Sequence, residues 1–379
     1  MRILVLIHEY PPVGGGGGRV AQDICEGLVE QGHEILILTA HCEDLPTKEQ
    51  HNGIKIQRLK SWRRLPYKAD IRAMAGYVWK SIWAGLKIIR KWHPQVIHTH
   101  FAVPAGASAW LLNRLTGVPY VLTAHLGDVP GGTPEKTGKW FKWVFPFTPP
   151  IWKRAAAVVA VSEFTRQLAL KSYPVEVGVI PNGVDLQKID PGMITLNDPP
   201  RIVFAGRFMQ QKNPLQIIRT LSTLKDLRWN CVLIGDGPLR QDIEDEIKAH
   251  GLEDRITLTG WIPPEAVLDW YARSDIMFMP SLSEGLPVVG VQALAMGLAL
   301  VLSRAGGNVE LIEQGKNGYL VDVRDVSGYE QSLRKLLSDP EACLAARLAS
   351  RRFAQRFEIH SIVSAYAEVF ARVSDPDRN

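Results

Sequence analysis

The sequence has few cysteines, no long apolar run and no strong excess of either charge. Its four cysteines, at positions 25, 42, 231 and 343, show neither Cys-x-x-Cys nor zinc spacing, which indicates buried thiols in a reducing compartment. No apolar run reaches the ~18–20 residues that a membrane-spanning helix needs. The first eight residues are typical of a strand and not of a signal peptide. We therefore expect a cytoplasmic protein, and neither a secreted, a transmembrane nor a disulfide-scaffold protein.

Charge gives little support for nucleic-acid binding. The 44 basic and 39 acidic residues leave a net charge of +5, which is mild for a chain of this length. A basic stretch at 55–92 would allow contact with nucleic acid, but no recognition module accompanies it. We therefore expect no nucleic-acid partner.

Two α/β domains are expected from the length of 379 residues and the 46% hydrophobic content. Short apolar runs alternate with longer stretches of helical periodicity, as in βαβ units with parallel sheets. The turn-rich segment 190–200 separates two such series, which predicts doubly wound Rossmann-like domains over 1–190 and 200–355, facing each other across a cleft. The apolar runs expected to form strands are 2–8, 34–40, 55–59, 95–101, 119–125, 157–162, 177–181, 201–206, 229–235, 255–260, 276–281, 299–304 and 318–322.

A glycine-rich loop follows the first expected strand. Pro11-Pro-Val precedes five consecutive glycines that end at Gly18, and a helix is expected to begin near Arg19. Backbone N–H groups of such a loop can approach a phosphate closely, and the helix N-terminus adds partial positive charge. Residues 16–21 also fit a loose GxGxxA, so a dinucleotide site is one interpretation. A flexible turn without a ligand is the alternative.

Two cations follow the first strand expected in the second domain. Arg207 and Lys212 lie in Ala205-Gly-Arg-Phe-Met-Gln-Gln-Lys-Asn, at a junction between a strand and a helix. Positive charge at a helix N-terminus opposes the helix dipole unless an anion is bound there. This pair therefore predicts a site for a diphosphate.

A carboxylate lies ahead of another helix in the same domain. Glu284 is placed on the turn after a strand, and Pro287 suits the first helical position. The N–H groups of Val288 and Val289 would then be free to bind an anion, and Gln292 could reach a pair of hydroxyls. A helix-capping role for Glu284 is the alternative.

Histidines end two strands of the first domain. His125 follows a strand at 119–125 and suits either a structural or a functional role. His98 and His100 would share one face of a strand, but no third ligand follows at a sensible spacing. We expect no metal site.

Tryptophans accompany two basic stretches of the first domain. Residues 55–92 hold eleven Lys and Arg and a single acid, Asp70, together with Trp62, Trp79, Trp83 and Trp92. Residues 136–154 add Lys136, Lys139, Lys142, Lys153 and Arg154 beside Trp140, Trp143 and Trp152. An anionic membrane surface would suit this composition. A solvated basic face above core tryptophans is the alternative.

The order and spacing of these segments resemble family 4 of the retaining glycosyltransferases, which have the GT-B architecture. The resemblance extends over most of the chain. It is carried by Pro11-Pro-Val-Gly-Gly, Gly32-His-Glu, Val179-Ile-Pro-Asn-Gly-Val-Asp, Gly206-Arg with Lys212, Gly235-Asp-Gly-Pro, Ser274-Asp with Met279-Pro-Ser, the Glu284 segment and Gly306-Gly-Asn-Val-Glu. It implies that a C-terminal helix at 356–379 returns to the first domain, the acceptor side in this architecture, and that the second domain binds the donor.

The resemblance also implies roles for the residues singled out above. Gly15 and Gly16 would face the diphosphate of a sugar-nucleotide donor, whose charge Arg207 and Lys212 would bind. Glu284 would contact the transferred sugar.

The remaining donor contacts are implied in the same way. His125 would hydrogen-bond the sugar or support the forming oxocarbenium ion. The backbone of Val288 and Val289 would hold phosphate, and Leu286 and Pro287 just before them would belong to the same donor-binding segment. Closure of the two domains about the 190–200 linker would bring His125 and Glu284 to the same sugar.

Gln292 departs from the family pattern. The family has a second glutamate there, which accepts hydrogen bonds from both ribose hydroxyls. An amide can accept from one hydroxyl but must offer N–H to the other. We expect the loss of one charge-assisted bond, about 1–2 kcal/mol, rather than the loss of function.

The implied reaction moves a hexosyl group from a nucleoside diphosphate sugar to a hydroxyl with retention of the α configuration. We expect a UDP-sugar in preference to GDP-mannose, and a glycan or lipid-linked acceptor of cell-surface or exopolysaccharide synthesis at the inner face of the plasma membrane. No cofactor or metal is expected, because fixed cations and helix N-termini can stabilise the diphosphate. The Asp-x-Asp at 375–377 lies in the C-terminal tail and not on a loop after a strand, where a metal-bridged transferase would need it.

Three competing functions remain at this point. A catalytically degenerate binding or scaffold protein would account for Gln292. A sugar-nucleotide epimerase would need a compact acid–base set that the sequence does not show. A nicotinamide oxidoreductase could use Glu43 or Asp44 for its ribose, but it leaves the cations at 207 and 212 unexplained.

Overall fold

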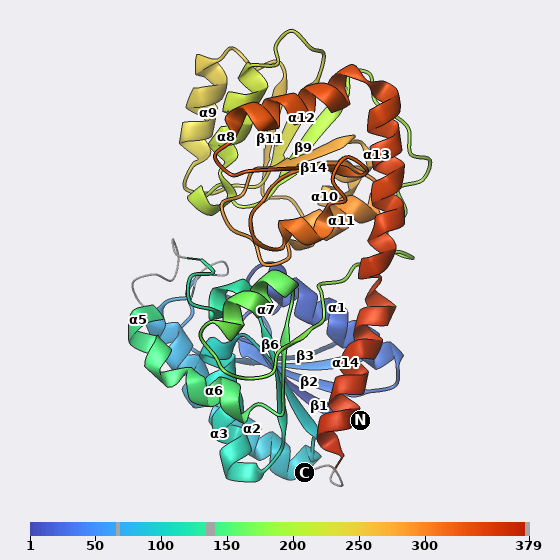
Figure 1. Cartoon of the computed structure of the whole chain (residues 1–379). Helices are drawn as coiled ribbons and strands as arrows, with labels where there is room; N and C mark the ends of the chain where they lie inside the picture. The colour runs from blue at the N-terminus through green and yellow to red at the C-terminus, as the bar shows by residue number, and fades with distance from the viewer. Residues whose placement is uncertain (66–68, 134–140, 376–379) are drawn as a thin grey trace. The chain divides into compact units, whose positions relative to one another are not determined.

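The computed structural model describes residues 1–65, 69–133 and 141–375. The chain divides into two compact units (Figure 1). Unit 1 comprises Met1–Gly183 together with Ile359–Asn379, and unit 2 comprises Val184–Glu358. Each unit is built around its own sheet, which confirms the expected pair of Rossmann-like α/β domains.

Unit 1 contains an eight-stranded sheet in the order β3-β4-β2-β1-β5-β6-β7-β8. Every pairing is parallel except that of β3 with β4. Strands such as β1 and β6 are buried on both faces, because helices cover the sheet, so their sequences are unbroken apolar runs. The strands are β1 Arg2–Leu6, β2 Glu34–Ala40, β3 Lys48–His51, β4 Ile54–Leu59, β5 Val96–His100, β6 Tyr120–Ala124, β7 Ala157–Ala160 and β8 Gly178–Val179.

The helices of unit 1 follow its strands and begin at identifiable caps. The Asp70 carboxylate accepts from Ala73 N at 2.7 Å and starts α2, which ends where His93 adopts a left-handed conformation. The helices are α1 Gly16–Glu30, α2 Ile71–Trp92, α3 Ala107–Thr116, α5 Phe141–Val144, α6 Pro149–Arg154, α7 Glu163–Leu170 and α14 Ile359–Ser374.

The last helix, α14, belongs to unit 1, as the family resemblance implied. It packs against α1, β5 and β6, and Tyr366 and Phe370 are buried in that contact. Gly27 of α1 is needed there, because a Cβ at this position would lie 2.6 Å from the Val363 side chain.

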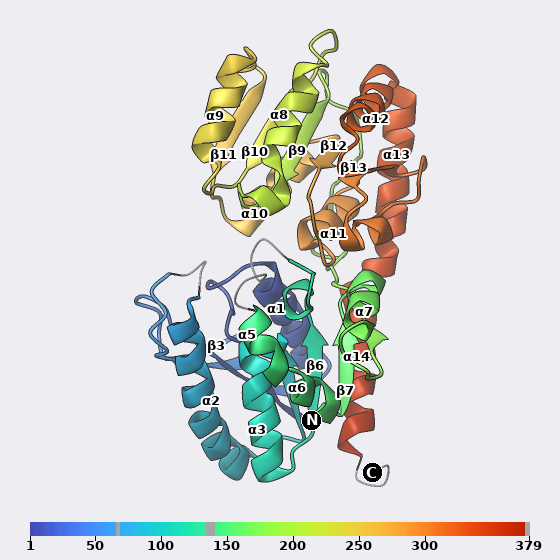
Figure 2. The ribbon, with the colours of Figure 1, turned by 60° about the vertical axis from the view of Figure 1, so that its left-hand side comes forward.

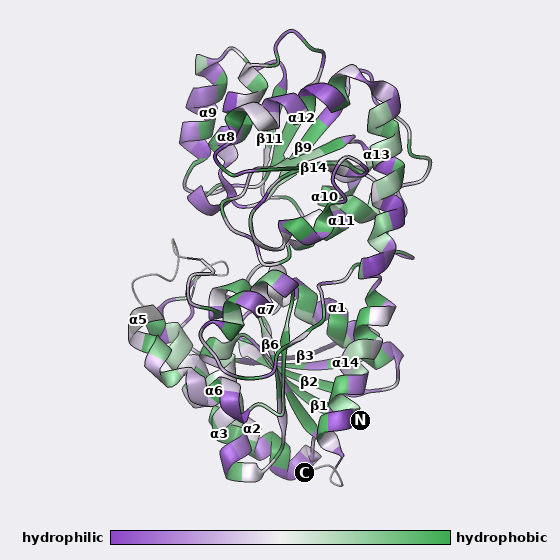
Figure 3. Cartoon of the chain, in the orientation of Figure 1, coloured by the Kyte–Doolittle hydropathy of each residue, from purple (hydrophilic) through white to green (hydrophobic). Residues whose placement is uncertain are grey.

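Unit 2 contains a six-stranded sheet in the order β11-β10-β9-β12-β13-β14, with every pairing parallel. Interior strands such as β9 are coloured mainly as hydrophobic in Figure 3. The strands are β9 Arg201–Ala205, β10 Asn230–Ile234, β11 Ile256–Gly260, β12 Ile276–Met279, β13 Ala299–Ser303 and β14 Gly318–Val321. The helices are α8 Pro214–Ser222, α9 Arg240–Ala249, α10 Pro264–Ala272, α11 Val288–Ala295, α12 Val326–Ser338 and α13 Pro340–Phe353.

Segment 190–200, predicted as a linker, packs as part of unit 2. Arg347 Nη1 forms an ion pair with Asp275 Oδ1 at 2.6 Å, with both side chains buried. Asp275 Oδ2 accepts from Asn197 Nδ2 at 2.9 Å, and Arg347 also donates to Thr195 O. This buried network holds the turn-rich segment against the sheet, so the chain divides at 183/184 and 358/359 instead of near 190–200 and 355/356.

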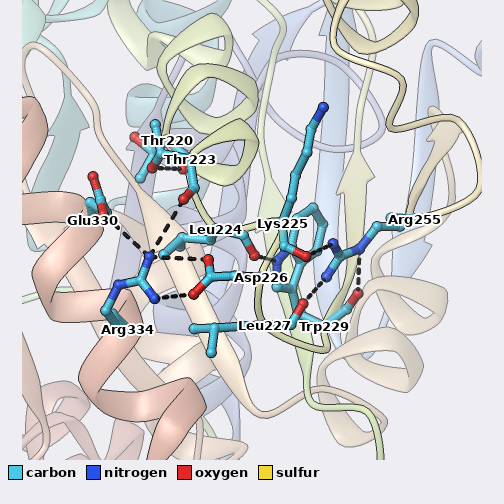
Figure 4. Close-up of polar contacts among 10 residues, drawn as sticks. All are labelled: Thr220, Thr223, Leu224, Lys225, Asp226, Leu227, Trp229, Arg255, Glu330 and Arg334. Atoms are coloured by element: carbon cyan, nitrogen blue, oxygen red, sulfur yellow. Dashed lines mark hydrogen bonds and ion pairs between the residues drawn. The ribbon is translucent and has the colours of Figure 1, made fainter.

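A pair of arginines fixes the turn between α8 and β10 (Figure 4). The Arg255 guanidinium lies 3.7 Å from the centroid of the Trp229 ring and donates to the carbonyls of Trp229, Lys225 and Leu227. Arg334 of α12 donates to both carboxylate oxygens of Asp226. The turn is therefore a rigid structural feature of unit 2.

No helix within the described residues is long and apolar enough to cross a membrane.

Candidate functional site

The glycine-rich loop connects β1 to α1 in unit 1. The helix begins at Gly16, with Gly15 as its N-cap, and therefore three residues before the predicted start. Gly14 has φ +102°, and a Cβ on it would lie 2.5 Å from Glu9 Cβ. A Cβ on Gly15, in contrast, would meet no heavy atom within 4 Å. The face of the loop at Gly15 is thus open, and first-turn N–H groups are available to an anion there.

Two buried arginines donate hydrogen bonds to backbone carbonyls of the same loop. Arg58 Nη2 donates to Pro11 O at 3.0 Å, and Arg63 Nη1 donates to His8 O at 3.2 Å. Arg63 Nη2 also pairs with Glu9 Oε1 at 3.3 Å. The basic surface expected for residues 55–92 is wrong for Arg58 and Arg63. Both are buried and donate to backbone carbonyls of the loop that follows β1.

His125 lies directly after β6, held by a buried carboxylate. Asp128 Oδ2 accepts from His125 N at 2.9 Å, while Asp128 Oδ1 accepts from Ala102 N at 2.8 Å. The His125 ring stacks on Phe101 with centroids 4.4 Å apart. A Cβ on Gly17 would lie 2.5 Å from the Phe101 ring. Phe101 therefore connects the glycine-rich loop to His125.

The histidines of unit 1 form a buried row. His98 Nε2 and Thr123 Oγ1 are 2.9 Å apart, and His100 Nδ1 lies 3.3 Å from His125 Nε2. Burial lowers the pKa of His98 to about 3 and that of His125 to about 4, and it lowers the pKa of His100 as well. All three rings are therefore neutral at pH 7. Among the described residues, no cluster of three or more His, Cys, Asp or Glu side chains could hold a metal ion.

In unit 2 a partly buried ion pair joins the two predicted anion-site segments. Lys212 Nζ lies 2.6 Å from Glu284 Oε1. Lys212 belongs to the loop after β9, in the short helical turn Gln210–Lys212, and Glu284 belongs to the loop after β12. Arg207 is half-buried on the same loop as Lys212. The carboxyl ends of neighbouring parallel strands thus bring a cation and a carboxylate together.

Backbone contacts fix the position of Glu284. Gln211 Nε2 donates to Ser283 O at 2.9 Å, and Gly307 N donates to Glu284 O at 3.0 Å. A Cβ on Gly306 would lie 1.8 Å from Glu284 O, so only glycine fits at that position. The Glu284 carboxylate is paired with Lys212 rather than capping a helix.

The helix after Glu284 is α11, whose first residue is Val288. Pro287, predicted at the first helical position, is the N-cap and has an extended conformation. Leu286 is buried, and the N–H groups of Val288 and Val289 belong to the first turn, where helices leave N–H groups unpaired. Gln292 is half-buried, and its side chain forms no hydrogen bond with any residue in the described ranges.

Each unit thus gathers the predicted residues at the carboxyl ends of its strands. Unit 1 places Gly17 of the glycine-rich loop against Phe101, on which the His125 ring stacks. Unit 2 pairs Lys212 with Glu284 in the loops that precede α8 and α11. Phe101 was missed by sequence reasoning, although its position directly after β5 was a signal.

The tryptophans of the basic stretches divide between surface and core. Trp152 is buried and stacks on Tyr173 with centroids 4.1 Å apart, and Trp92 is half-buried. The exposed members are Trp62, Trp79, Trp83 and Trp143. Lys136, Lys139, Trp140 and Asp377 lie outside the described residues.

Comparison with known families assigns each half of the chain. Residues 14–188 match the family described as Glycosyltransferase Family 4, and residues 190–353 match Glycosyl transferases group 1. The relatives include a UDP-Gal:alpha-D-GlcNAc-diphosphoundecaprenol alpha-1,3-galactosyltransferase of Escherichia coli, 24% identical over 77% of this chain and 79% of that protein. A glycogen synthase of Mycobacterium tuberculosis is 25% identical over 100% of this chain and 96% of that protein.

Solved structures of the same fold cover nearly the whole chain. A sucrose-phosphate synthase from Thermosynechococcus elongatus superposes with a TM-score of 0.86 at 19% identity, covering 98% of each chain. Anabaena Alr3699/HepE in complex with UDP and glucose superposes with a TM-score of 0.77 at 17% identity, over 98% of this chain and 100% of that chain.

Proposed function

Because the chain belongs to glycosyltransferase family 4 and has the GT-B fold, we propose that it transfers a hexosyl group from a nucleoside diphosphate sugar with retention of the α configuration. The observation that carries the proposal is the Lys212–Glu284 pair at 2.6 Å beside the N-terminus of α11. In the proposed reaction, Lys212 supplies fixed positive charge for the departing diphosphate, and the adjacent Glu284 supplies a carboxylate for the sugar.

The leaving group is the first chemical demand of this reaction. As the bond between the anomeric carbon and the phosphate oxygen breaks, negative charge grows on the diphosphate. Lys212, Arg207 and the first-turn N–H groups of α11 stabilise that charge without having to reorganise. This arrangement does not need a metal, and we propose that the reaction is metal-independent.

The electron-poor anomeric carbon is the second demand. A neutral His125, with its pKa lowered to about 4 by burial, offers the sugar a hydrogen bond without placing a cation beside the developing positive charge. In front-face attack the acceptor oxygen bonds to the anomeric carbon, and its proton moves to the leaving phosphate oxygen. In this mechanism Glu284 contacts the sugar but forms no covalent bond with the anomeric carbon.

The relatives guide the choice of donor and acceptor. One relative is named for UDP-Gal and a diphosphoundecaprenol-linked sugar, and one structural neighbour was solved with UDP-glucose. We propose a UDP-sugar in preference to GDP-mannose, and a glycan or lipid-linked acceptor of cell-surface polysaccharide synthesis. Turnover with any donor would exclude a degenerate scaffold protein.

A nucleotide panel on the wild type and Gln292→Glu tests the proposal. Thermal shifts are measured with UDP, GDP, ADP, NAD and common sugar nucleotides in EDTA. One nucleotide family should raise the melting temperature selectively, since a ligand at 100 times its dissociation constant adds about 2.7 kcal/mol. Gln292→Glu should bind that donor roughly tenfold more tightly, because a carboxylate accepts from both ribose hydroxyls.

The matched control is Gln331→Glu, which adds the same charge at an exposed position of α12. Donor affinity should be unchanged in this variant. A shift with NAD alone would indicate an oxidoreductase instead, and no shift with any nucleotide would contradict the proposal. Equal donor affinities of the wild type and Gln292→Glu would show that Gln292 does not contact the ribose.

A further inference from the structure

The outer face of α2 carries tryptophan and positive charge without a single acid. The 22 residues of this helix include no Asp or Glu. Ala73, Gly76, Tyr77, Ser81, Gly85 and Ile89 are its buried residues, and α3 is a main packing partner. Figure 2 shows α2 beside α3 along one edge of unit 1. The exposed residues of the helix are Ile71, Arg72, Ala75, Trp79, Trp83, Lys87, Arg90 and Lys91.

Two of these exposed residues form an aromatic pair. Trp79 and Trp83 lie one helical turn apart and are 62% and 54% exposed. Their ring centroids are 5.9 Å apart at an interplanar angle of 70°. Large aromatic rings bury apolar area when they can, so a contiguous exposed pair marks a contact surface rather than a core.

Trp62 extends this pair along the helix. Its backbone has φ +60°, which is unfavourable for a bulky residue, and its side chain is 68% exposed. The ring lies over Gly76, where a Cβ would come within 2.6 Å of it. The chain thus adopts a strained conformation that places a third tryptophan on the outer side of α2.

The charges around these rings are of one sign. Arg72, Lys87 and Arg90 are exposed on the same helix. The nearest acid in sequence, Asp70, is occupied as the N-cap of α2, where it accepts from Ala73 N. We define the α2 surface as Trp62, Trp79, Trp83, Arg72, Lys87 and Arg90.

We propose that the α2 surface docks on an anionic phospholipid bilayer. Amphipathic indole rings suit the headgroup region, and each Lys or Arg near an anionic leaflet adds favourable attraction. The composition, with aromatic rings flanked by cations and no acid, is complementary to such a surface. Docking is a property of unit 1 alone, and its use in presenting a lipid-linked acceptor rests on the proposed function.

Vesicle sedimentation tests this proposal on the full-length protein. Vesicles of phosphatidylcholine with phosphatidylglycerol are compared with pure phosphatidylcholine at low and at high salt. The protein should bind the anionic vesicles at low salt, with a blue shift of tryptophan emission, and should be released by high salt. No binding at low salt would overturn the proposal, as would binding to RNA or DNA duplexes in place of vesicles.

Paired variants assign the binding to this face. Lys87→Ala with Arg90→Ala should weaken partitioning roughly 30-fold, given the attraction per basic residue. Trp79→Ala with Trp83→Ala should weaken partitioning and reduce the blue shift, to which the exposed Trp62 still contributes. Trp261→Ala is the matched control, because Trp261 is 63% exposed in unit 2 and should leave partitioning unchanged. Unchanged partitioning in both double variants would overturn the assignment.

The nucleotide panel separates this proposal from the proposed function. Both double variants should retain the nucleotide-dependent rise in melting temperature, because their substitutions are on an outer helix of unit 1. If vesicles fail to bind while a sugar nucleotide still stabilises the protein, the docking proposal fails and the proposed function stands.

Discussion

Lys212→Met is expected to lower kcat by roughly 10²–10³, the cost of removing one fixed donor from developing transition-state charge. Lys212 Nζ lies 2.6 Å from Glu284 Oε1, and the Glu284 side chain is buried. The substitution removes the diphosphate's cation and also leaves Glu284 without its partner. Release of nucleoside diphosphate from the donor measures the effect, and the melting temperature of each variant reports any loss of fold.

Glu284→Gln separates the two roles of the pair. It should also lower kcat strongly, but it should bind the free nucleoside diphosphate at least as tightly, because Lys212 is then free for the ligand. Lys316→Met is the matched control, since Lys316 pairs with Glu313 at 3.8 Å on the exposed surface of unit 2. Full turnover in Lys212→Met with an intact fold would contradict the role assigned to this cation.

Unit 1 is expected to lose stability on acidification well before unit 2. Burial lowers the pKa of His8 and His125 to about 4 and that of His98 to about 3, and it lowers that of His100. The unfolded chain binds these protons near pH 6.5, whereas the folded chain does not. Their stabilising contribution is therefore complete above pH 6.5 and is lost as the pH falls toward 4. At pH 5 the loss is about 2 kcal/mol for each of His8, His98 and His125, and His100 adds to it in the same direction.

One group in the same region acts in the opposite direction. Burial raises the pKa of Asp128 to about 7, so its folded form takes up a proton on acidification more readily than the unfolded chain does. On acidification, protonation of Asp128 stabilises the folded state by about as much as one of the four histidines destabilises it. The net change still destabilises unit 1.

Hydrogen exchange between pH 7 and pH 5 measures this difference unit by unit. Unit 2 serves as an internal control, because its single histidine, His250, lies at the surface and forms no part of a buried row. Amides of β1, β5 and β6 should lose protection by pH 5 while those of β9 and β12 keep theirs. Equal loss in both units, or none in unit 1, would contradict the account of the histidine row.

The sequence predicted the sheets well because their strands are buried on both faces. Each expected apolar run coincides with a strand of the structure, and among the strands of the described residues only β3 was not expected. Lys48–His51 is an edge strand of four polar residues, so it carries no hydrophobic signal. The packing of segment 190–200 against unit 2 could not be predicted, because its turn residues give no sign of contacts with the distant Asp275 and Arg347.

The site could be predicted only as separate motifs. Lys212 and Glu284 can each be identified in the sequence, but their ion pair depends on the adjacency of β9 and β12 in the sheet. The supporting roles of Arg58 and Arg63 were hidden in the same way, because a basic residue in a basic stretch gives no sign of burial. Long-range pairing is not encoded in local periodicity, so these contacts required the fold.

A direct measurement of donor cleavage tests whether this chain transfers a glycosyl group from a sugar nucleotide with retention. The donor selected by the nucleotide panel is followed by proton NMR in the presence of EDTA, with water or a simple sugar as acceptor. We expect nucleoside diphosphate to accumulate and the first-formed product to have the α configuration. An intact donor, or a first product with the β configuration, would contradict it.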